Sequence, residues 1–338
     1  MNLRLLLLIF IVFLFSCQKD EDINEPDVEY SPEISFDITT HFFPAENIKQ
    51  IEFADNRFYY SIGSKIFLAD QTGRTLKTYS ADSDVLSLKF NPKDESLYFG
   101  TKSSGLGRSK SNNIQYFTVE NSDLPRDLIR NVHADNDGNI WFNASAHQVG
   151  GLVKYDGKHF TEYNPENSDL PENLLHKICI RENEIFVLSR GAETGKVGLK
   201  FKNNTWYGLF ESGGCGITDM DIDSDANMYY IEDSREYCGG GLLPDDVVFV
   251  FKNGEKTMLR EFPDLMHIHY YLLKTDKRNY LWNVKFGYQD LKRLSVYDGE
   301  NWYQPPESFP DDFINCIEVD DENNIWLGTN NGIYILNQ

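Results

Sequence analysis

The chain has 338 residues, with 53 acidic and 32 basic side chains and a formal net charge of −21. This charge and the lack of a basic run argue against binding to the phosphate backbone of nucleic acid, because such binding needs clustered Lys and Arg. Aromatic residues make up 14% of the sequence, which suits packed β-sheets. We therefore expect an acidic all-β protein with no nucleic-acid partner.

Residues 1–16 have the pattern of a signal peptide. Arg4 precedes an apolar run that ends at Phe15, and this run is too short to span a bilayer, which takes roughly 20 residues. Ser16-Cys17 at its end resembles the lipobox of bacterial lipoproteins, although Phe15 departs from the usual pattern. The resemblance implies that Cys17 is lipidated and begins the mature protein. An ordinary secretory signal is the alternative.

Residues 17–32 are polar and acidic. The segment from Gln18 to Asp22 looks like the export signal that sends Bacteroidetes lipoproteins to the outer face of the outer membrane, and a plain charged tether is the alternative. Its charge, together with Pro26 and Pro32, favours disorder. We expect a tether between the lipid and a single domain that covers residues 33–338.

From about residue 47 to the C-terminus one sequence pattern recurs, in which an apolar strand is followed by a polar turn and an aromatic residue. The aromatic positions lie 39 to 53 residues apart, close to the period of roughly 40–50 residues for one propeller blade. The sequence therefore predicts a seven-bladed β-propeller with four antiparallel strands per blade. The seven aromatic positions are Tyr59, Tyr98, Trp141, Phe186, Tyr229, Trp282 and Trp326.

The third repeat states the pattern most fully. Residues 128–135 alternate as an inner strand, and the Asp, Asn and Gly residues of 136–139 favour a tight turn. Residues 140–142, 151–155 and 159–163 are expected to form the second, third and fourth strands. The predicted blade thus runs from the channel outward.

Near-copies within the chain indicate duplication, since Glu120–Pro125 returns letter for letter as Glu166–Pro171. The segments Asp135–Trp141 and Asp320–Thr329 resemble the two-component regulator propeller repeat. In that family the propellers are sensor regions of membrane histidine kinases. The resemblance implies a propeller fold and ligand sensing, and not phosphotransfer, because the sequence has no kinase motif.

The two ends of the repeat region predict how the ring closes. The last repeat provides three strands, ending at Gly332–Leu336, whereas the apolar stretch Ile34–Phe43 has no partner of its own. We expect this N-terminal strand to complete the seventh blade, because an unpaired edge strand is a liability.

Loops between the second and third strands lie on the face of a propeller that commonly binds ligands, and they are long in the third to sixth repeats. These loops are 143–150, 189–196, 232–246 and 285–292. We predict an asymmetric ligand site there, and tolerated insertions are the alternative. The candidate ligand-binding residues are His147, Arg190, Arg235, Tyr237 and Tyr288.

Cysteine and metal chemistry give one further prediction. Cys215 begins the fifth repeat and Cys238 lies in its long loop, so an exported protein could join them in a disulfide. Cys179 and Cys316 fall in inner strands and are expected to be buried thiols. The pair His267 and His269, and the acidic turns near residues 135–139 and 219–225, are weak metal signals that loop and turn chemistry explains. We predict no metal and no cofactor.

Two functions fit the sequence. The first is a non-catalytic, membrane-anchored lipoprotein whose propeller binds a carbohydrate, a peptide or a protein. The second is a propeller enzyme, either a lyase similar to streptogramin lyases or a glycoside-cleaving enzyme, although no common catalytic motif occurs and no catalytic residue is named. A glycosidase needs two carboxylates about 5 to 10 Å apart. The loop candidates are Glu193, Glu232, Asp233 and Glu236.

Overall fold

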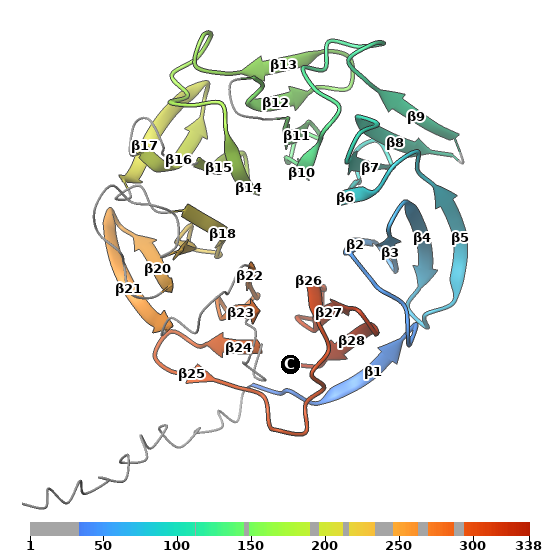
Figure 1. Cartoon of the computed structure of the whole chain (residues 1–338), viewed down its shortest axis with the longest axis vertical. Coiled ribbons are helices and arrows are strands. Elements are labelled where there is room, and N and C mark those ends of the chain that lie inside the picture. Colours follow the sequence, from blue (N-terminus) through green and yellow to red (C-terminus); the bar gives the residue numbers. More distant parts are fainter. Residues whose placement is uncertain are drawn as a thin grey trace, which may run out of the picture.

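The computed structural model forms a ring of seven four-stranded antiparallel sheets around a central axis (Figure 1). The predicted all-β, seven-bladed propeller with four strands per blade is confirmed. Among the residues described, no helix is long and apolar enough to cross a membrane. The signal peptide, Cys17 and the tether lie outside the described residues. The structure describes residues 34–111, 113–144, 149–189, 196–211, 216–233, 246–262, 270–286 and 294–338.

Within each blade the strands run in chain order from the axis outward, except in the last. The first blade has β2 (Gln50–Ala54), β3 (Arg57–Ile62), β4 (Lys65–Asp70) and β5 (Thr75–Ser80). The second has β6 (Val85–Asn91), β7 (Ser96–Thr101), β8 (Leu106–Lys110) and β9 (Asn113–Phe117). The third has β10 (Arg130–Ala134), β11 (Ile140–Asn143), β12 (Leu152–Tyr155) and β13 (Phe160–Tyr163). The fourth has β14 (Leu175–Arg181), β15 (Glu184–Ser189), β16 (Lys196–Lys202) and β17 (Thr205–Glu211).

The remaining blades follow the same plan. The fifth has β18 (Gly216–Ile222), β19 (Met228–Asp233), β20 (Asp246–Lys252) and β21 (Glu255–Phe262). The sixth has β22 (Tyr270–Thr275), β23 (Leu281–Phe286), β24 (Leu294–Tyr297) and β25 (Trp302–Tyr303). The seventh has β26 (Ile314–Val319), β27 (Ile325–Thr329) and β28 (Gly332–Leu336), with β1 (Ile38–Phe42) as its outer strand.

An aspartate organises the turn that precedes the repeated aromatic residue. In the third blade, Asp135 accepts hydrogen bonds from the backbone N–H of Asp137 and Asn139 at 3.0 and 2.8 Å. Its second oxygen accepts from the Trp141 indole N–H at 2.8 Å. Gly138, at φ 87°, supplies the left-handed residue that closes the turn. The recurrent turn and aromatic residue thus form one hydrogen-bonded unit.

The hydrophobic core lies between blades. All seven repeated aromatic residues are buried, and each belongs to a cluster shared with the following blade. Trp326 of the last blade, for example, meets the rings of Phe53 and Phe58 of the first blade at centroid distances of 5.2 and 4.9 Å. The period of the sequence pattern therefore reflects the packing of one sheet against the next.

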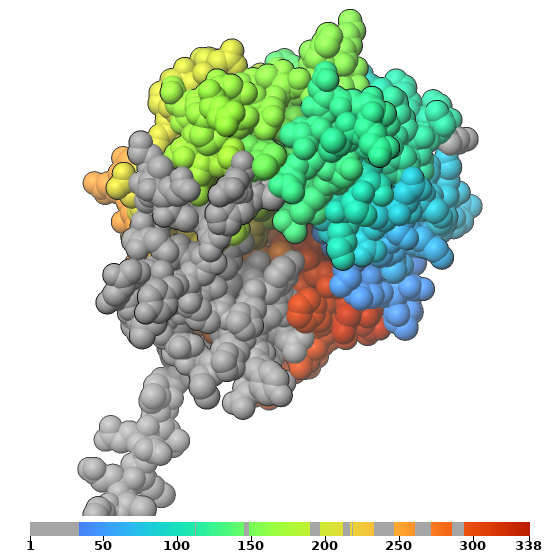
Figure 2. All heavy atoms as spheres, turned by 45° about the horizontal axis from the view of Figure 1, so that its top comes forward, coloured from blue at the N-terminus to red at the C-terminus, as the bar shows by residue number. Residues whose placement is uncertain are grey.

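The N-terminal strand closes the ring as predicted. Strand β1 pairs antiparallel with β28, with Phe42 opposite Ile333. Just before β1, the side chain of Gln338 bonds the backbone N and O of Ser35 at 3.2 and 2.7 Å. Ile34 and Phe36 are buried in the adjoining core. In the space-filling view, the blue residues near the N-terminus lie against the red residues near the C-terminus (Figure 2).

Candidate functional site

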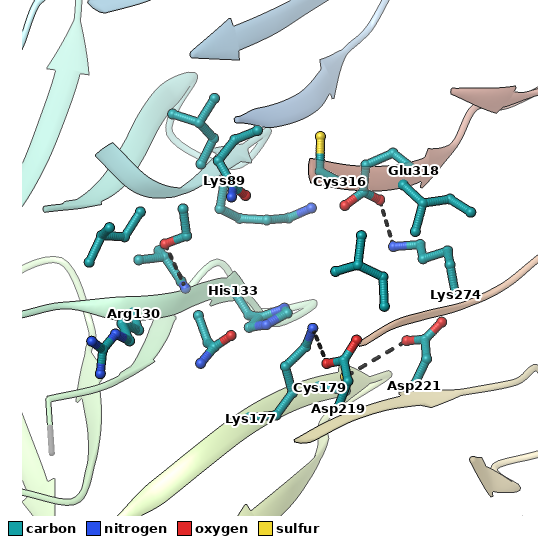
Figure 3. Close-up of a pocket in the computed structure, with 18 of the residues that line it drawn as sticks. Lys89, Arg130, His133, Lys177, Cys179, Asp219, Asp221, Lys274, Cys316 and Glu318 are labelled. Atoms are coloured by element: carbon teal, nitrogen blue, oxygen red, sulfur yellow. Dashed lines mark hydrogen bonds and ion pairs between the residues drawn. The ribbon is translucent and has the colours of Figure 1, made fainter. Parts of the chain in front are cut away.

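A polar cavity of about 540 Å³ occupies the central channel, and all seven inner strands contribute to it (Figure 3). Its size is in the range of small-molecule binding sites. Four carboxylates and four basic side chains line it, together with two imidazoles and two thiols. No Phe, Tyr or Trp is among the described lining residues. The charged and polar lining residues are Glu52, Lys89, Arg130, His133, His176, Lys177, Cys179, Asp219, Asp221, Lys274, Cys316 and Glu318.

Seven of these side chains occupy one equivalent position in the seven blades. Each lies on an inner strand directly opposite the repeated aromatic residue of the second strand, as Glu52 lies opposite Tyr59. Residues directly opposite each other in an antiparallel pair lie on the same face of the sheet, and in every blade the inner-strand member of this pair lines the cavity. Around the ring the seven residues are Glu52, Lys89, His133, Cys179, Asp221, Lys274 and Glu318. We call this set the channel ring.

Three ion pairs in the channel join neighbouring blades. Lys89 lies 2.8 Å from Glu52 and connects the first two blades. The other two pairs are Lys177 with Asp219 at 2.6 Å, and Lys274 with Glu318 at 2.5 Å. They connect the fourth blade with the fifth and the sixth with the seventh. The ion pairs therefore have a structural role in holding the inner strands together.

Channel carboxylates also accept backbone hydrogen bonds from the next inner strand. Glu52 accepts from the N–H of Phe90 at 3.0 Å, and Asp219 from that of Leu273 at 2.8 Å. Asp221 accepts from both the N–H and the hydroxyl of Thr275, at 2.6 and 2.9 Å. Because adjacent inner strands are not paired as a sheet, these bonds satisfy backbone donors that would otherwise depend on channel water.

His133 is the imidazole of the channel ring, and it stays uncharged. Burial, and then the ammonium groups of Lys89, Lys177 and Lys274, lower its pKa from 6.5 to about 3. The imidazole is therefore neutral near pH 7. Burial alone would lower the pKa of Lys177, but the adjacent Asp219 carboxylate raises it above its ordinary value, so that lysine stays charged.

The two channel thiols, Cys179 and Cys316, stay protonated and are poor nucleophiles. Burial raises the pKa of Cys179 and of Cys316, and the negative charges of Asp221 and Glu318, respectively, raise it further. The thiolate is the nucleophilic form, and neither residue provides it at neutral pH. Both were expected to be buried thiols in inner strands, and both are free and buried.

The structure bears only in part on the site predicted from the loops. All four long loops do lie between the second and third strands of the third to sixth blades. However, the residues proposed for the ligand site and the disulfide lie outside the described residues. These residues are His147, Arg190, Arg235, Tyr237, Tyr288, Cys215 and Cys238. Whether the long loops bind a ligand stays a prediction.

Two of the four carboxylates assigned to loops from the sequence, Glu232 and Asp233, lie in strand β19. Glu232 lies within β19 and is buried, where it forms an ion pair with Lys256 at 2.5 Å. The same ammonium group lies 3.8 Å from the centre of the Phe249 ring. Glu232 is thus an internal partner of the sheet rather than a free carboxylate on a loop. Glu193, Glu236, His267 and His269 lie outside the described residues.

The acidic turns have the hydrogen-bond partners expected of turn chemistry. Asp223 accepts from the backbone N–H of Asp225 and of Asn227, both at 2.9 Å. Its other oxygen accepts from the Asn227 amide at 2.8 Å and the Tyr229 hydroxyl at 3.3 Å. The Asp135 turn is built in the same way. Within the described part of the chain no group of three or more candidate ligands is placed to hold a metal ion.

The channel ring was missed by sequence reasoning, although a signal for it exists. Each member lies seven to nine positions before the aromatic residue of its repeat, and several interrupt an apolar strand, as in Ile51-Glu52-Phe53 and Leu88-Lys89-Phe90. A charged residue at the same register of successive inner strands marks the face that meets the axis. The long loops, by contrast, indicated a site at the rim of the propeller.

Comparison with known proteins supports the interpretation of the repeat. The family model described as the two component regulator propeller matches residues 308–331, which include all of the inner and second strands of the last blade, β26 and β27. No curated protein sequence matches the chain.

Solved structures share the propeller fold at low sequence identity. The extracellular domain of a protein assigned as a hybrid two-component system of B. thetaiotaomicron has a TM-score of 0.64 at 14% identity, over 86% of this chain and 40% of that one. A second extracellular domain, assigned to a one-component system of the same organism, has a TM-score of 0.62 at 17% identity, over 88% and 39%.

A streptogramin B lyase structure has a TM-score of 0.65 at 13% identity, over 90% of this chain and 96% of that one. The chain thus spans about two fifths of the two regulator domains but nearly the whole lyase. At these identities the similarity concerns the fold. With the repeat match in the last blade, the chain is a seven-bladed propeller that carries the two-component regulator propeller repeat.

Proposed function

We propose that this protein is a non-catalytic, membrane-anchored surface lipoprotein whose propeller binds a carbohydrate, peptide or protein ligand, with the central channel as the binding site. The observation that supports the proposal most strongly is the composition of the channel ring. Its seven equivalent positions hold five different residue types, carrying negative, positive and no charge.

Two of the ion pairs that join neighbouring blades, Glu52 with Lys89 and Lys274 with Glu318, account for four of the seven ring positions, and these pairs do not include His133, Cys179 or Asp221. The turns, by contrast, use one residue type repeatedly. The Asp that bonds the aromatic residue recurs as Asp135, Asp223, Asp276 and Asp320. The channel positions have instead diverged within the same repeats. A chemically asymmetric surface inside a cavity of about 540 Å³ is suited to recognising one orientation of a small ligand or of one projecting group of a larger one.

The extracellular location and the lipid anchor are also proposals. Two similar structures are extracellular domains of B. thetaiotaomicron proteins assigned to signalling systems, and the N-terminal residues of this chain resemble a lipoprotein signal that ends at Cys17. Replacing Cys17 with Ala should abolish incorporation of labelled palmitate and release the protein from the membrane fraction. Unchanged labelling of the Cys17→Ala variant would contradict the anchor.

The binding proposal is tested by screening the full chain, purified in detergent, against glycan and peptide arrays. Hits are then confirmed by thermal shift, since a ligand at 100 times its Kd stabilises the folded state by about 2.7 kcal/mol. Lys89→Met and His133→Gln should weaken a confirmed hit. Lys202→Met is the matched control, because Lys202 pairs with Glu184 on the exterior. Equal affinity of all three variants and the wild type would place the ligand outside the channel.

An enzymatic function is the second candidate, and one observation favours it. The similarity to the streptogramin B lyase extends over 96% of that chain, and the channel of this protein contains the imidazole of His133 among charged side chains. If the protein is a lyase, a confirmed ligand should be converted to product, and the conversion should be lost in His133→Gln. Saturable binding without turnover favours the non-catalytic function.

A further inference from the structure

Three ammonium groups converge on one neutral imidazole inside the channel. Lys89, Lys177 and Lys274 come from three different blades, and the charge of each one acts on His133. In the close-up, the ammonium group of Lys177 lies beside the His133 ring, and that of Lys89 points into the channel above them (Figure 3). An ammonium group has three N–H donors, and each of these lysines uses one on its carboxylate partner. Donor capacity therefore remains directed at the axis.

The channel carboxylates, by contrast, are bound at the wall. Glu52 and Asp219 each accept both a lysine and a backbone N–H of the adjacent strand. Asp221 accepts two hydrogen bonds from Thr275. The carboxylate acceptors are thus occupied at the channel wall, whereas the lysine ammonium donors reach towards the axis. The middle of the channel is therefore a better site for a ligand group that accepts hydrogen bonds than for one that donates them.

The lining also indicates how a ligand is recognised. No Phe, Tyr or Trp faces the cavity among its described lining residues, so stacking of a sugar ring on an aromatic side chain contributes little there. Charge-assisted hydrogen bonds are the strong interactions that this lining offers.

We infer that the channel holds the carboxylate group of a small ligand between Lys89 and Lys177, beside His133. The inference rests on the proposed function, since it names the chemistry recognised at the same site. Two sources can supply such a carboxylate, namely an acidic sugar and the C-terminus of a short peptide.

Charge balance adds an independent expectation. The lining contains four carboxylates against three lysines and Arg130, so the empty channel is neutral in sum. A ligand carboxylate adds one negative charge close to the ammonium groups of Lys89 and Lys177. The charged groups that act on His133 are Lys89 from β6, Lys177 from β14 and Lys274 from β22, and the thiol of Cys179 lines the same cavity. Because burial and these three ammonium groups hold the pKa of His133 at about 3, the imidazole should stay uncharged, and binding should occur without proton uptake near pH 7.

The test compares two matched pairs of probes by calorimetry on the full chain in detergent. The sugar pair is glucuronate and glucose, and the peptide pair is diglycine and diglycinamide. In at least one pair, the carboxylate member should bind about tenfold more tightly than its neutral partner, as one charge-assisted hydrogen bond implies. The pair that shows the preference identifies the source.

Variants of single lysines provide the controls. Lys89→Met should remove the preference for the carboxylate, whereas Lys202→Met, which breaks an exterior ion pair, should retain it. If Lys89→Met fails to fold, Lys177→Met, which removes the second ammonium group of the proposed site, decides the question in the same way. Equal binding within both pairs, or no binding of any probe, overturns the inference. A neutral ligand found on the arrays would still leave the proposed function standing.

Discussion

The neutral His133 predicts a specific dependence of stability on pH. In the folded protein its pKa is about 3, whereas in the unfolded chain it returns to 6.5. Between these values the unfolded state binds the extra proton, so the free energy of unfolding falls as the pH falls from 6.5 towards 3. One proton is worth about 1.4 kcal/mol per pH unit, so at pH 5 the loss assigned to His133 is about 2 kcal/mol.

The assay is urea denaturation of the wild type and His133→Gln at pH 7.5 and pH 5.0. Other titrating groups affect both proteins alike, so the difference between their free energies of unfolding isolates His133. This difference should shift by about 2 kcal/mol in favour of the variant at pH 5.0. His159→Gln, which removes an exposed histidine, should follow the wild type. An equal loss in the wild type and His133→Gln would refute the argument that the channel keeps this imidazole uncharged.

Three further predictions concern the stability of the propeller. Deleting residues 34–43 removes β1 and the buried Ile34 and Phe36. Burial of each such side chain contributes about 1.5–3 kcal/mol to a free energy of unfolding of about 5–15 kcal/mol, so circular dichroism should show an unfolded protein. An unchanged melting temperature would contradict closure of the ring by β1. Asp320→Ala leaves the N–H donors of Asn324 and Trp326 without their acceptor. Urea denaturation should show a free energy of unfolding that is lower by ~2 kcal/mol or more. A loss below ~0.5 kcal/mol would show that the turn does not depend on the carboxylate. Non-reducing mass mapping should find Cys215 joined to Cys238, and reduction should destabilise the protein by about 3 kcal/mol; two free thiols at these positions would refute the pairing.

The fold could be predicted from the sequence because its determinants are local and repeated. The turn built on Asp135 or Asp320 uses residues within six positions of each other, so the pattern is visible in the sequence. The repeated aromatic residue is buried against the next blade in every case. The closing strand could be identified because the last repeat lacks one strand while an apolar segment precedes the first.

The channel could not be predicted in the same way, because its contacts are not local. Lys89 pairs with a carboxylate 37 positions away and Lys177 with one 42 positions away, and neither spacing is marked by a motif. Irregular register in β10 and β14 also obscures which residues of the inner strand face the axis. Glu232 shows the opposite error, since its assignment to a loop overlooked that β19 extends to Asp233.

The most direct test of ligand binding in the channel is the ¹⁵N spectrum of the histidine side chains with and without a ligand confirmed on the arrays. His133 lies in the channel ring, to which all seven blades contribute, and the His133→Gln variant identifies its signal. Binding in the channel should shift this signal and leave that of the exposed His159 unchanged. A saturating ligand that leaves the His133 signal in place would show that it binds elsewhere on the propeller.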